Sequence, residues 1–305
     1  MPDWIAQNEH EGTRVDVLLA EKMKLSRAQV QKMVKAGTIL INAKIAKPHT
    51  LVYEGDVLTY PKGAPKPPAQ KPAPPIPVVF ENDDFLVIDK PAGIAVHSAH
   101  EGDARPSVID VIAKTRRGMK KIGDNPLRPG VVHRLDKDVS GIMVIAKTEK
   151  MFEELKRQFA TREVKKEYVA LVYGKMPLDH GEITFAIARS KTRKRMVSRP
   201  EGQEGKEAYT EYDVLERFKN STLVKVVIAT GRTHQIRTHF KAIGHPVVGD
   251  KLYYTKLVHI RPLELGRLFL HARALTITLP DGTRKTFESP LPAPLADLLL
   301  TLPKK

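Results

Sequence analysis

Short apolar runs of strand length recur over the last three quarters of the chain, whereas stretches with helical spacing are fewer. The clearest helical stripes predict helices at 151–159 and 235–243. Because most of the predicted strands follow one another without an intervening helix, we expect an α+β domain around a mixed, largely antiparallel sheet. The predicted strands lie at 78–80, 85–88, 131–132, 142–145, 168–172, 223–228 and 275–279.

The first sixty residues show a different order of elements, two helices followed by two short strands. The first helix is predicted around 15–19, and the second runs from Ser26, its expected N-cap, to Gly37. Strands are expected at 39–41 and 57–60. The second helix carries a polar, basic face, made of Arg27, Gln31, Lys32 and Lys35. This order resembles the αL-type RNA-binding module of a small-subunit ribosomal protein and of several RNA-modifying enzymes.

A proline-rich stretch separates this module from the rest of the chain. Residues 61–75 read PKGAPKPPAQKPAPP, with seven prolines in fifteen positions and no aliphatic residue larger than alanine. Such a stretch cannot pack a core and predicts a stiff, basic tether. The sequence therefore divides into a small RNA-binding module at 1–60, a linker at 61–75 and a large domain at 76–305.

Composition narrows the class of protein. Lys and Arg number 51 against 35 Asp and Glu, a net charge of +16, so we expect a polyanionic partner, with nucleic acid first. The densest basic run, RSKTRKRMVSR at 189–199, fits RNA contact or an ordinary solvated loop.

Cysteine is absent, which excludes disulfides and thiol catalysis. Without a signal peptide or an apolar run of membrane length, we expect a cytoplasmic protein with no membrane partner. We also expect it to be a monomer.

The run VVHRLDKDVSGIMVIAK, residues 131–147, places a dense cluster of charge between two apolar runs. Ser140 and Gly141 predict a turn, so the charged residues are expected in a loop at the end of a sheet. An ordinary solvated connection would show the same pattern. The segment by itself leaves both readings open.

A second segment, TGRTHQIRTHFKAIGHPVVGDKLYY at 230–254, bears on this choice. Thr233 is the expected cap of a helix that ends at Gly244, and Arg237 falls at the margin of its buried stripe. A buried guanidinium requires a carboxylate partner, for which Asp136 is the obvious candidate. The alternative is an ordinary interior ion pair.

Other kinds of site lose support. The glycines at 118 and 123 imitate a phosphate-binding loop but lack the lysine that should follow, and neither a dinucleotide fingerprint nor a nucleophile elbow is present. His234, His239 and His245 have spacings that match no common metal motif. We therefore expect no metal and no cofactor.

Five segments occur in the order and at the intervals of the RluA-type pseudouridine synthases. The N-terminal module and the tether resemble most the RluD-like branch, which modifies large-subunit ribosomal RNA. One departure is Val139, where many members of the family have threonine. The segments are DKPAGIAVH (89–97), HRLDKDVSG (133–141), KKEYVALVYG (165–174), TGRTHQIRTHFKAIGHPVVGD (230–250) and FLHARALTI (269–277).

The resemblance implies that residues 76–305 form a pseudouridine synthase domain that isomerises uridine in structured RNA. Asp136 would be the nucleophile, and Arg237 would keep its carboxylate charged and aimed. Tyr168 would lie against the base and take part in proton removal, unless it is simply a core tyrosine. Ile236 would form part of the apolar floor of the pocket.

The same resemblance implies how RNA is held. A base must leave the stack before it can react, and Arg134 would take the vacated space. His133 would lie close to the RNA backbone. The loop residues Arg232, His234 and Gln235 complete the expected substrate contacts.

Three alternatives remain open at this point. The chain could be a non-catalytic RNA-binding or ribosome-assembly factor, although the acid and its arginine are both present. A synthase that acts on transfer RNA would carry the same motifs. A hydrolase that uses Asp136 with Asp138 would need a second, well-placed carboxylate or a metal.

Overall fold

The computed structural model describes residues 3–61, 73–98, 100, 103, 105–190, 192, 195–200, 202–254 and 262–304. Most of the expected tether, together with Lys191, Arg193 and Lys194 of the basic run, lies outside the described residues. The chain divides into two compact units, Met1–Lys71 and Pro72–Lys305, and each is described by itself. None of the described helices is long and apolar enough to cross a membrane.

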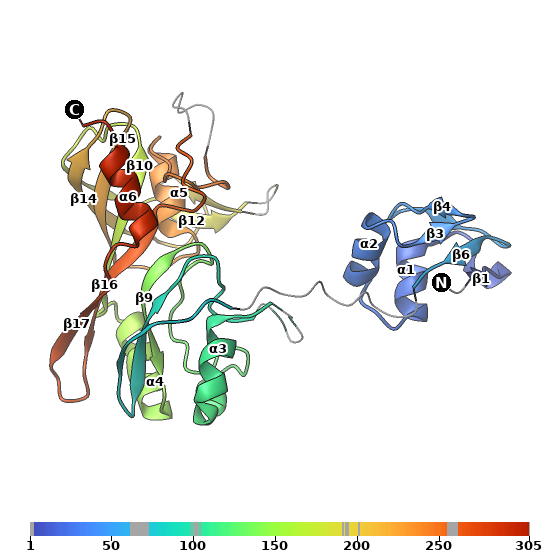
Figure 1. Ribbon diagram of the computed structural model, residues 1–305, viewed down its shortest axis with the longest axis horizontal. Helices are drawn as coiled ribbons and strands as arrows, with labels where there is room; N and C mark the ends of the chain where they lie inside the picture. The colour runs from blue at the N-terminus through green and yellow to red at the C-terminus, as the bar shows by residue number, and fades with distance from the viewer. Residues whose placement is uncertain are drawn as a thin grey trace. The chain divides into compact units, whose positions relative to one another are not determined.

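The N-terminal unit packs two helices against small sheets, as the sequence predicts (Figure 1). Ser26 caps the second helix by accepting a hydrogen bond from the backbone N–H of Gln29, and Gly37 follows that helix with a φ of 71°. The main sheet has the order β1-β6-β3-β4. The elements are β1 (Asp3–Ile5), η1 (Asn8–His10), β2 (Thr13–Arg14), α1 (Val15–Lys22), α2 (Arg27–Lys35), β3 (Leu40–Ile41), β4 (Lys44–Ile45), β5 (Leu51–Val52) and β6 (Val57–Thr59).

The polar face of α2 is not wholly free for RNA. Arg27 and Gln31 both donate to the carboxylate of Asp16, a fully buried residue of α1 that also binds Arg14. Burial alone would raise the pKa of Asp16, but the hydrogen bonds from Arg14, Gln31 and Arg27 hold it well below its usual range. These two residues of the predicted basic face therefore fasten α1 to α2.

The C-terminal unit is built on a nine-stranded sheet with the order β11-β14-β15-β10-β16-β9-β8-β7, and β17 pairs with β16. Its described strand pairs are antiparallel except for β16 with β9, so the predicted α+β class with a mixed, largely antiparallel sheet is confirmed. The strands are β7 (Val78–Glu81), β8 (Phe85–Lys90), β9 (Ser140–Ala146), β10 (Lys165–Tyr173), β11 (His180–Ile183), β14 (Thr210–Arg217), β15 (Ser221–Ile228), β16 (Leu270–Thr278) and β17 (Arg284–Glu288), with a separate pair β12 (Ala186–Arg189) and β13 (Met196–Arg199). The helices are α3 (Val108–Thr115), η2 (Arg117–Lys121), α4 (Glu149–Ala160), α5 (Gln235–Ala242) and α6 (Ala293–Thr301).

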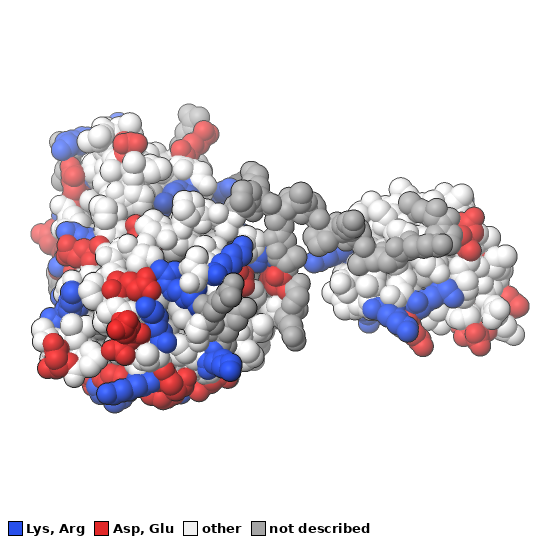
Figure 2. Space-filling view, turned by 60° about the horizontal axis from the view of Figure 1, so that its bottom comes forward, with Lys and Arg blue, Asp and Glu red and all other residues white. Residues whose placement is uncertain are grey.

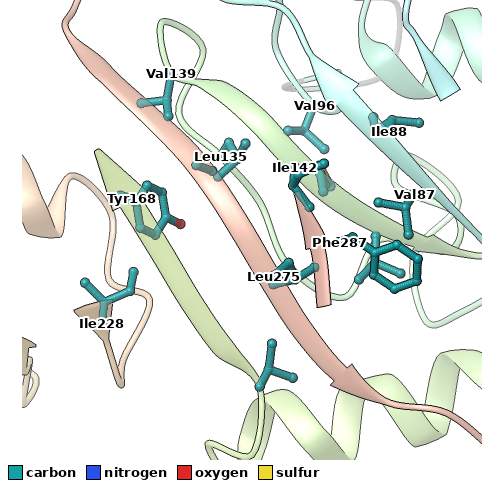
Figure 3. Packing of buried hydrophobic residues seen from close by; sticks show 14 of the residues in the cluster. Val87, Ile88, Val96, Leu135, Val139, Ile142, Tyr168, Ile228, Leu275 and Phe287 are labelled. Atoms are coloured by element: carbon teal, nitrogen blue, oxygen red, sulfur yellow. The ribbon is translucent and has the colours of Figure 1, made fainter. Parts of the chain in front are cut away.

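Strand β10 is buried on both faces because its side chains alternate between two cores. Tyr168, Ala170 and Val172 belong to the large core that includes residues of α3, α4 and α5. Leu171 and Tyr173 point the other way, into a smaller core with residues of α6. Figure 3 shows part of the large core, in which Tyr168 packs near residues that precede β9.

Two local predictions around β9 were wrong. Residues 131–132 form no strand and belong to the loop before β9, and Ser140 and Gly141 are the first residues of that strand instead of a turn. Gly141 has a φ of 120°, and a Cβ atom there would collide with the backbone of Ala272 on β16. The glycine thus permits the close parallel pairing of β9 with β16.

This close approach gives a test of the fold. Gly141→Ala should lower the free energy of unfolding by about 3 kcal/mol or more, since it combines backbone strain with a clash against another strand. Gly118→Ala is the matched control, because no atom lies within 4 Å of the added Cβ. Denaturant unfolding of both variants checks the result, and equal stabilities would contradict the role given to Gly141.

Candidate active site

The loop at 131–139 is held in place by a buried lysine at the end of β8. Lys90 is fully buried, and its Nζ donates to the carbonyls of Pro91 (2.9 Å), Ile94 (2.9 Å) and Lys137 (3.1 Å). The N–H of Gly93 donates to the same Lys137 carbonyl at 2.8 Å. The segment that carries Asp136 is therefore tied to the rigid end of the sheet.

Arg237, on α5, contacts two carboxylates. Its Nε and Nη2 donate to Asp250 at 2.6 and 3.0 Å, and its Nη1 donates to Asp136 at 3.2 Å. The exposed fractions of the side chains are 8% for Arg237, none for Asp250 and 18% for Asp136. Burial alone would lower the pKa of Arg237, but the two carboxylates raise it, so the guanidinium stays charged. Asp136 is the most exposed side chain of this trio.

Asp250 is the residue that the sequence analysis missed. We expected Asp136 to be the main partner of Arg237, yet the two-pronged pair is made with Asp250. Asp250 also accepts hydrogen bonds from the backbone N–H groups of Leu252 and Tyr253. The sequence signal that could have identified Asp250 is its place directly after the run VVG, because a carboxylate that is buried with an apolar run needs a cationic partner.

The start of α5 differs from the prediction. The N-cap is His234, in the left-handed region with a φ of 56°, and not Thr233. Its Nδ1 lies 2.8 Å from the hydroxyl of Tyr253, and the backbone N–H of Met196 donates to that same hydroxyl. The hydroxyl can donate to Nδ1 while it accepts from Met196, and in that arrangement His234 carries its hydrogen on Nε2. That nitrogen is 3.7 Å from Asp136.

Gln235 fixes the loop that leads into this helix. Its side-chain oxygen accepts from the Thr230 hydroxyl at 2.8 Å and from the backbone N–H of Arg232 at 3.0 Å. Its amide nitrogen donates to the carbonyl of Tyr209 and the hydroxyl of Thr210. Both ends of the amide are thus engaged within the protein, and the expected contact of Gln235 with substrate stays a prediction.

A pocket of about 60 Å³ opens beside Asp136 and is called the Asp136 pocket. Tyr168 and Ile236 give it apolar walls, and both are almost fully buried. Burial, with Asp136 nearby, raises the pKa of Tyr168, so its phenol is neutral. Arg134 and Arg232 complete the lining with positive charge. The arrangement brings a carboxylate, an apolar slot and cations together.

Residues 84–242, a little over half of the chain, match the family model for RNA pseudouridylate synthase. The chain belongs to the RNA pseudouridine synthase family. Its quoted motifs are those of the RluA type. Residues 13–58 match the model of the S4 domain, so the enzyme consists of a synthase domain preceded by an RNA-binding module.

Several relatives resemble the synthase over nearly their whole length. An uncharacterized RNA pseudouridine synthase of Bacillus subtilis is 35% identical, covering 99% of this chain and 98% of that protein. A protein of Nitrosomonas europaea described as ribosomal large subunit pseudouridine synthase D is 36% identical, covering 94% of this chain and 84% of its own. Among solved structures, human RNA pseudouridylate synthase domain containing 1 matches with a TM-score of 0.59 and 26% identity, over 77% of this chain and all of its own.

His133 and Arg134, which lie three and two positions before Asp136 in the synthase, have unlike surroundings. The ring of His133 stacks on Phe159, with centroids 4.5 Å apart, and its Nε2 accepts a hydrogen bond from the N–H of Val144. Arg134 is exposed and has no hydrogen-bond or ion-pair partner among the described residues. Arg134 is therefore free to move toward RNA, whereas His133 is fixed within the fold, and its expected contact with RNA stays a prediction.

The three histidines considered as metal ligands have separate partners. His239 donates from Nε2 to the carbonyl of Phe185 at 2.9 Å, and His245 donates from Nδ1 to the carbonyl of Tyr173 at 2.8 Å. His234 faces Asp136. The three rings thus serve different parts of the synthase.

The setting of His133 predicts a pH effect on stability. Burial, with Lys166 nearby, lowers the pKa of His133 from 6.5 to about 3. Between pH 6.5 and about 3 the unfolded chain binds a proton at His133 that the folded chain does not bind. The free energy by which His133 favours the folded state is therefore complete above the unfolded pKa, and it is lost as the pH falls toward 3. In His133→Gln the free energy of unfolding should therefore fall less steeply with decreasing pH than in the parent, with a slope smaller by up to about 1.4 kcal/mol per pH unit.

Denaturant unfolding of the whole chain between about pH 4 and 7 measures this slope. His180→Gln is the control, since His180 is exposed and Asp213 raises its pKa, which predicts no flattening. A slope for His133→Gln equal to that of the parent would show that His133 is not held neutral.

Proposed function

We propose that Asp136 is the nucleophile with which this synthase converts uridine to pseudouridine in large-subunit ribosomal RNA. The contact with Arg237 carries the proposal, because it holds a carboxylate in a pocket that has apolar walls on one side and cations on the other. The nearby carboxylates fit the role less well. Asp250 is fully buried and engaged with Arg237, and Asp138 is exposed and lines a different pocket with Lys90, which also argues against a hydrolase with two acids.

The chemistry requires no group from outside the RNA. The bond between C1′ of the sugar and N1 of uracil breaks, the ring turns, and C5 bonds to C1′ in its place. The hydrogen of C5 leaves as a proton while N1 gains one, so atoms and electrons balance. Asp136 attacks C1′ or supports the transient loss of a sugar proton, and Arg237 stabilises its charge when it departs.

Tyr168 acts as a surface for the detached ring. Its raised pKa keeps the phenol protonated, so the C5 proton passes more readily to a group that is already ionised, for which the released Asp136 carboxylate in the same pocket is the candidate. Ile236, on the neighbouring helix, closes the slot against water. Tyr168 would then assist proton removal by positioning the ring.

Arg134 is proposed to replace the flipped base in the RNA stack. Extrusion of a base costs a few kcal/mol, and a planar guanidinium that fills the gap offsets part of this cost. The absence of a described partner for Arg134 leaves it free for this movement. His133 beside it is fixed and sets the direction of the loop.

Ribosomal RNA is the substrate that we favour, with transfer RNA as the alternative. The Nitrosomonas relative carries the name of a large-subunit enzyme, and the S4 domain supplies a second module for a large RNA. On the face drawn in Figure 2, Lys and Arg lie among Asp and Glu, so no single broad patch of the coloured residues identifies the RNA. We further propose that the enzyme acts in the cytoplasm as a monomer.

The proposal predicts that Asp136→Asn abolishes isomerisation while the stability of the chain changes little, because Arg237 keeps its stronger pair with Asp250. Total RNA from cells that lack the protein is incubated with the parent or the variant, and pseudouridines are then mapped by sequencing. New sites in large-subunit RNA with the parent alone are expected. Normal turnover by the variant would refute the nucleophile, and new sites confined to transfer RNA would refute the substrate.

A further inference from the structure

A second pocket, of about 400 Å³, adjoins the Asp136 pocket and is called the basic pocket. Five cations line it, and none of its described lining residues is Asp or Glu. The two pockets have Tyr168, Ile228 and Gly231 in common, as well as two of the cations. The five cations are Arg128, Arg134, Arg162, Lys166 and Arg232.

Two groups in the wall of the basic pocket are incompletely satisfied by the described residues. Lys166 is 7% exposed, and the only hydrogen bond of its Nζ to a described residue goes to the carbonyl of Ala229, at 3.2 Å. Burial and the nearby Arg162 lower the pKa of Lys166 to about 8. The Nδ1 of His97 is buried without a hydrogen-bond partner among the described residues. An anion in the pocket would give Lys166 a counter-charge and relieve the repulsion among the cations.

The two arginines at the rim, Arg128 and Arg162, have exposed side chains. Arg128 is exposed, and its side chain makes no hydrogen bond or ion pair with another described residue. Arg162 is exposed and follows α4 with a φ of 63°, the left-handed conformation with which this helix ends, since the N–H of Glu163 donates to the carbonyl of Gln158. Its ion pair with Glu207, at 3.6 Å, joins two exposed side chains and contributes little. Neither arginine is therefore committed to a strong partner within the described part of the chain.

The two pockets differ in size and charge, and each suits a different part of a nucleotide. The Asp136 pocket, at about 60 Å³, is much smaller than the roughly 300 Å³ of an ordinary ligand pocket, whereas the basic pocket lies within that range. The small pocket has the apolar walls that suit a uracil ring. The larger one has the charge that suits the backbone attached to it.

We propose that the basic pocket binds RNA phosphates next to the target uridine, with Arg128, Arg162 and Lys166 as phosphate-binding residues. The proposal rests on the proposed isomerisation at Asp136. It adds a function for the pocket, since contacts to phosphates fix the register in which a strand enters a site. The flipped uridine would then reach Asp136 with its backbone already held.

The test is the salt dependence of RNA binding by the full-length chain. The probe is a short, labelled, single-stranded oligouridylate, and the variant is Arg128→Gln with Arg162→Gln. Each phosphate contact contributes about 0.7 to the slope of log affinity against log salt for a single strand. The double variant should therefore bind more weakly at low salt and show a slope smaller by about 1.4.

The matched control is Arg273→Gln with Arg284→Gln, which removes two exposed arginines of β16 and β17 that line neither pocket. The control should keep the parent slope. A second probe with uncharged methylphosphonate linkages should bind equally to the parent and to the Arg128 and Arg162 variant. A slope for that variant equal to the control, or a loss of affinity that persists on the uncharged probe, would overturn the proposal. Because binding is measured without turnover, these outcomes are independent of the test at Asp136.

Discussion

The site depends on one buried cation shared by two carboxylates. Removing Arg237 and Asp250 from water is unfavourable, and their paired hydrogen bonds offset that cost only while both are present. The Nη1 of the same arginine donates to Asp136, so the pair with Asp250 also positions a carboxylate that is not part of it. A cation anchored in this way keeps the reactive carboxylate charged and in position, and it leaves the pocket in front of the carboxylate open.

The sheet supplies the rigidity that this arrangement needs. Asp136 precedes β9 and Arg237 follows β15, and the strand order β15-β10-β16-β9 brings both loops to one site, with Tyr168 of β10 between them. Lys90, at the end of β8, ties the Asp136 loop to the sheet through three carbonyls. Residues far apart in the chain are thus fixed by backbone elements, which is how a site reaches the precision that catalysis requires.

Much of the fold follows from local pattern, and the misses have physical causes. The periodicity at α5 and the Ser26 cap were read correctly because both depend on nearby residues. Gly141 was taken for a turn because sequence does not show that β16 passes against it. That Arg237 needs an acid was predictable from burial, but the choice between Asp136 and Asp250 depends on the path of a loop. Tyr168 is both a core residue and a wall of the pocket, a double role that alternation along a strand cannot reveal.

The most direct test separates the contribution of Arg237 to stability from its contribution to the rate of reaction. Arg237→Met strands Asp250 and should cost about 3–5 kcal/mol of stability together with most of the single-turnover rate at saturating RNA. Adding Asp250→Asn removes the stranded charge and retains an acceptor for the nearby backbone N–H groups. The account predicts that stability then recovers in large part while the rate stays low. Recovery of the rate together with stability would show that Arg237 serves the fold alone.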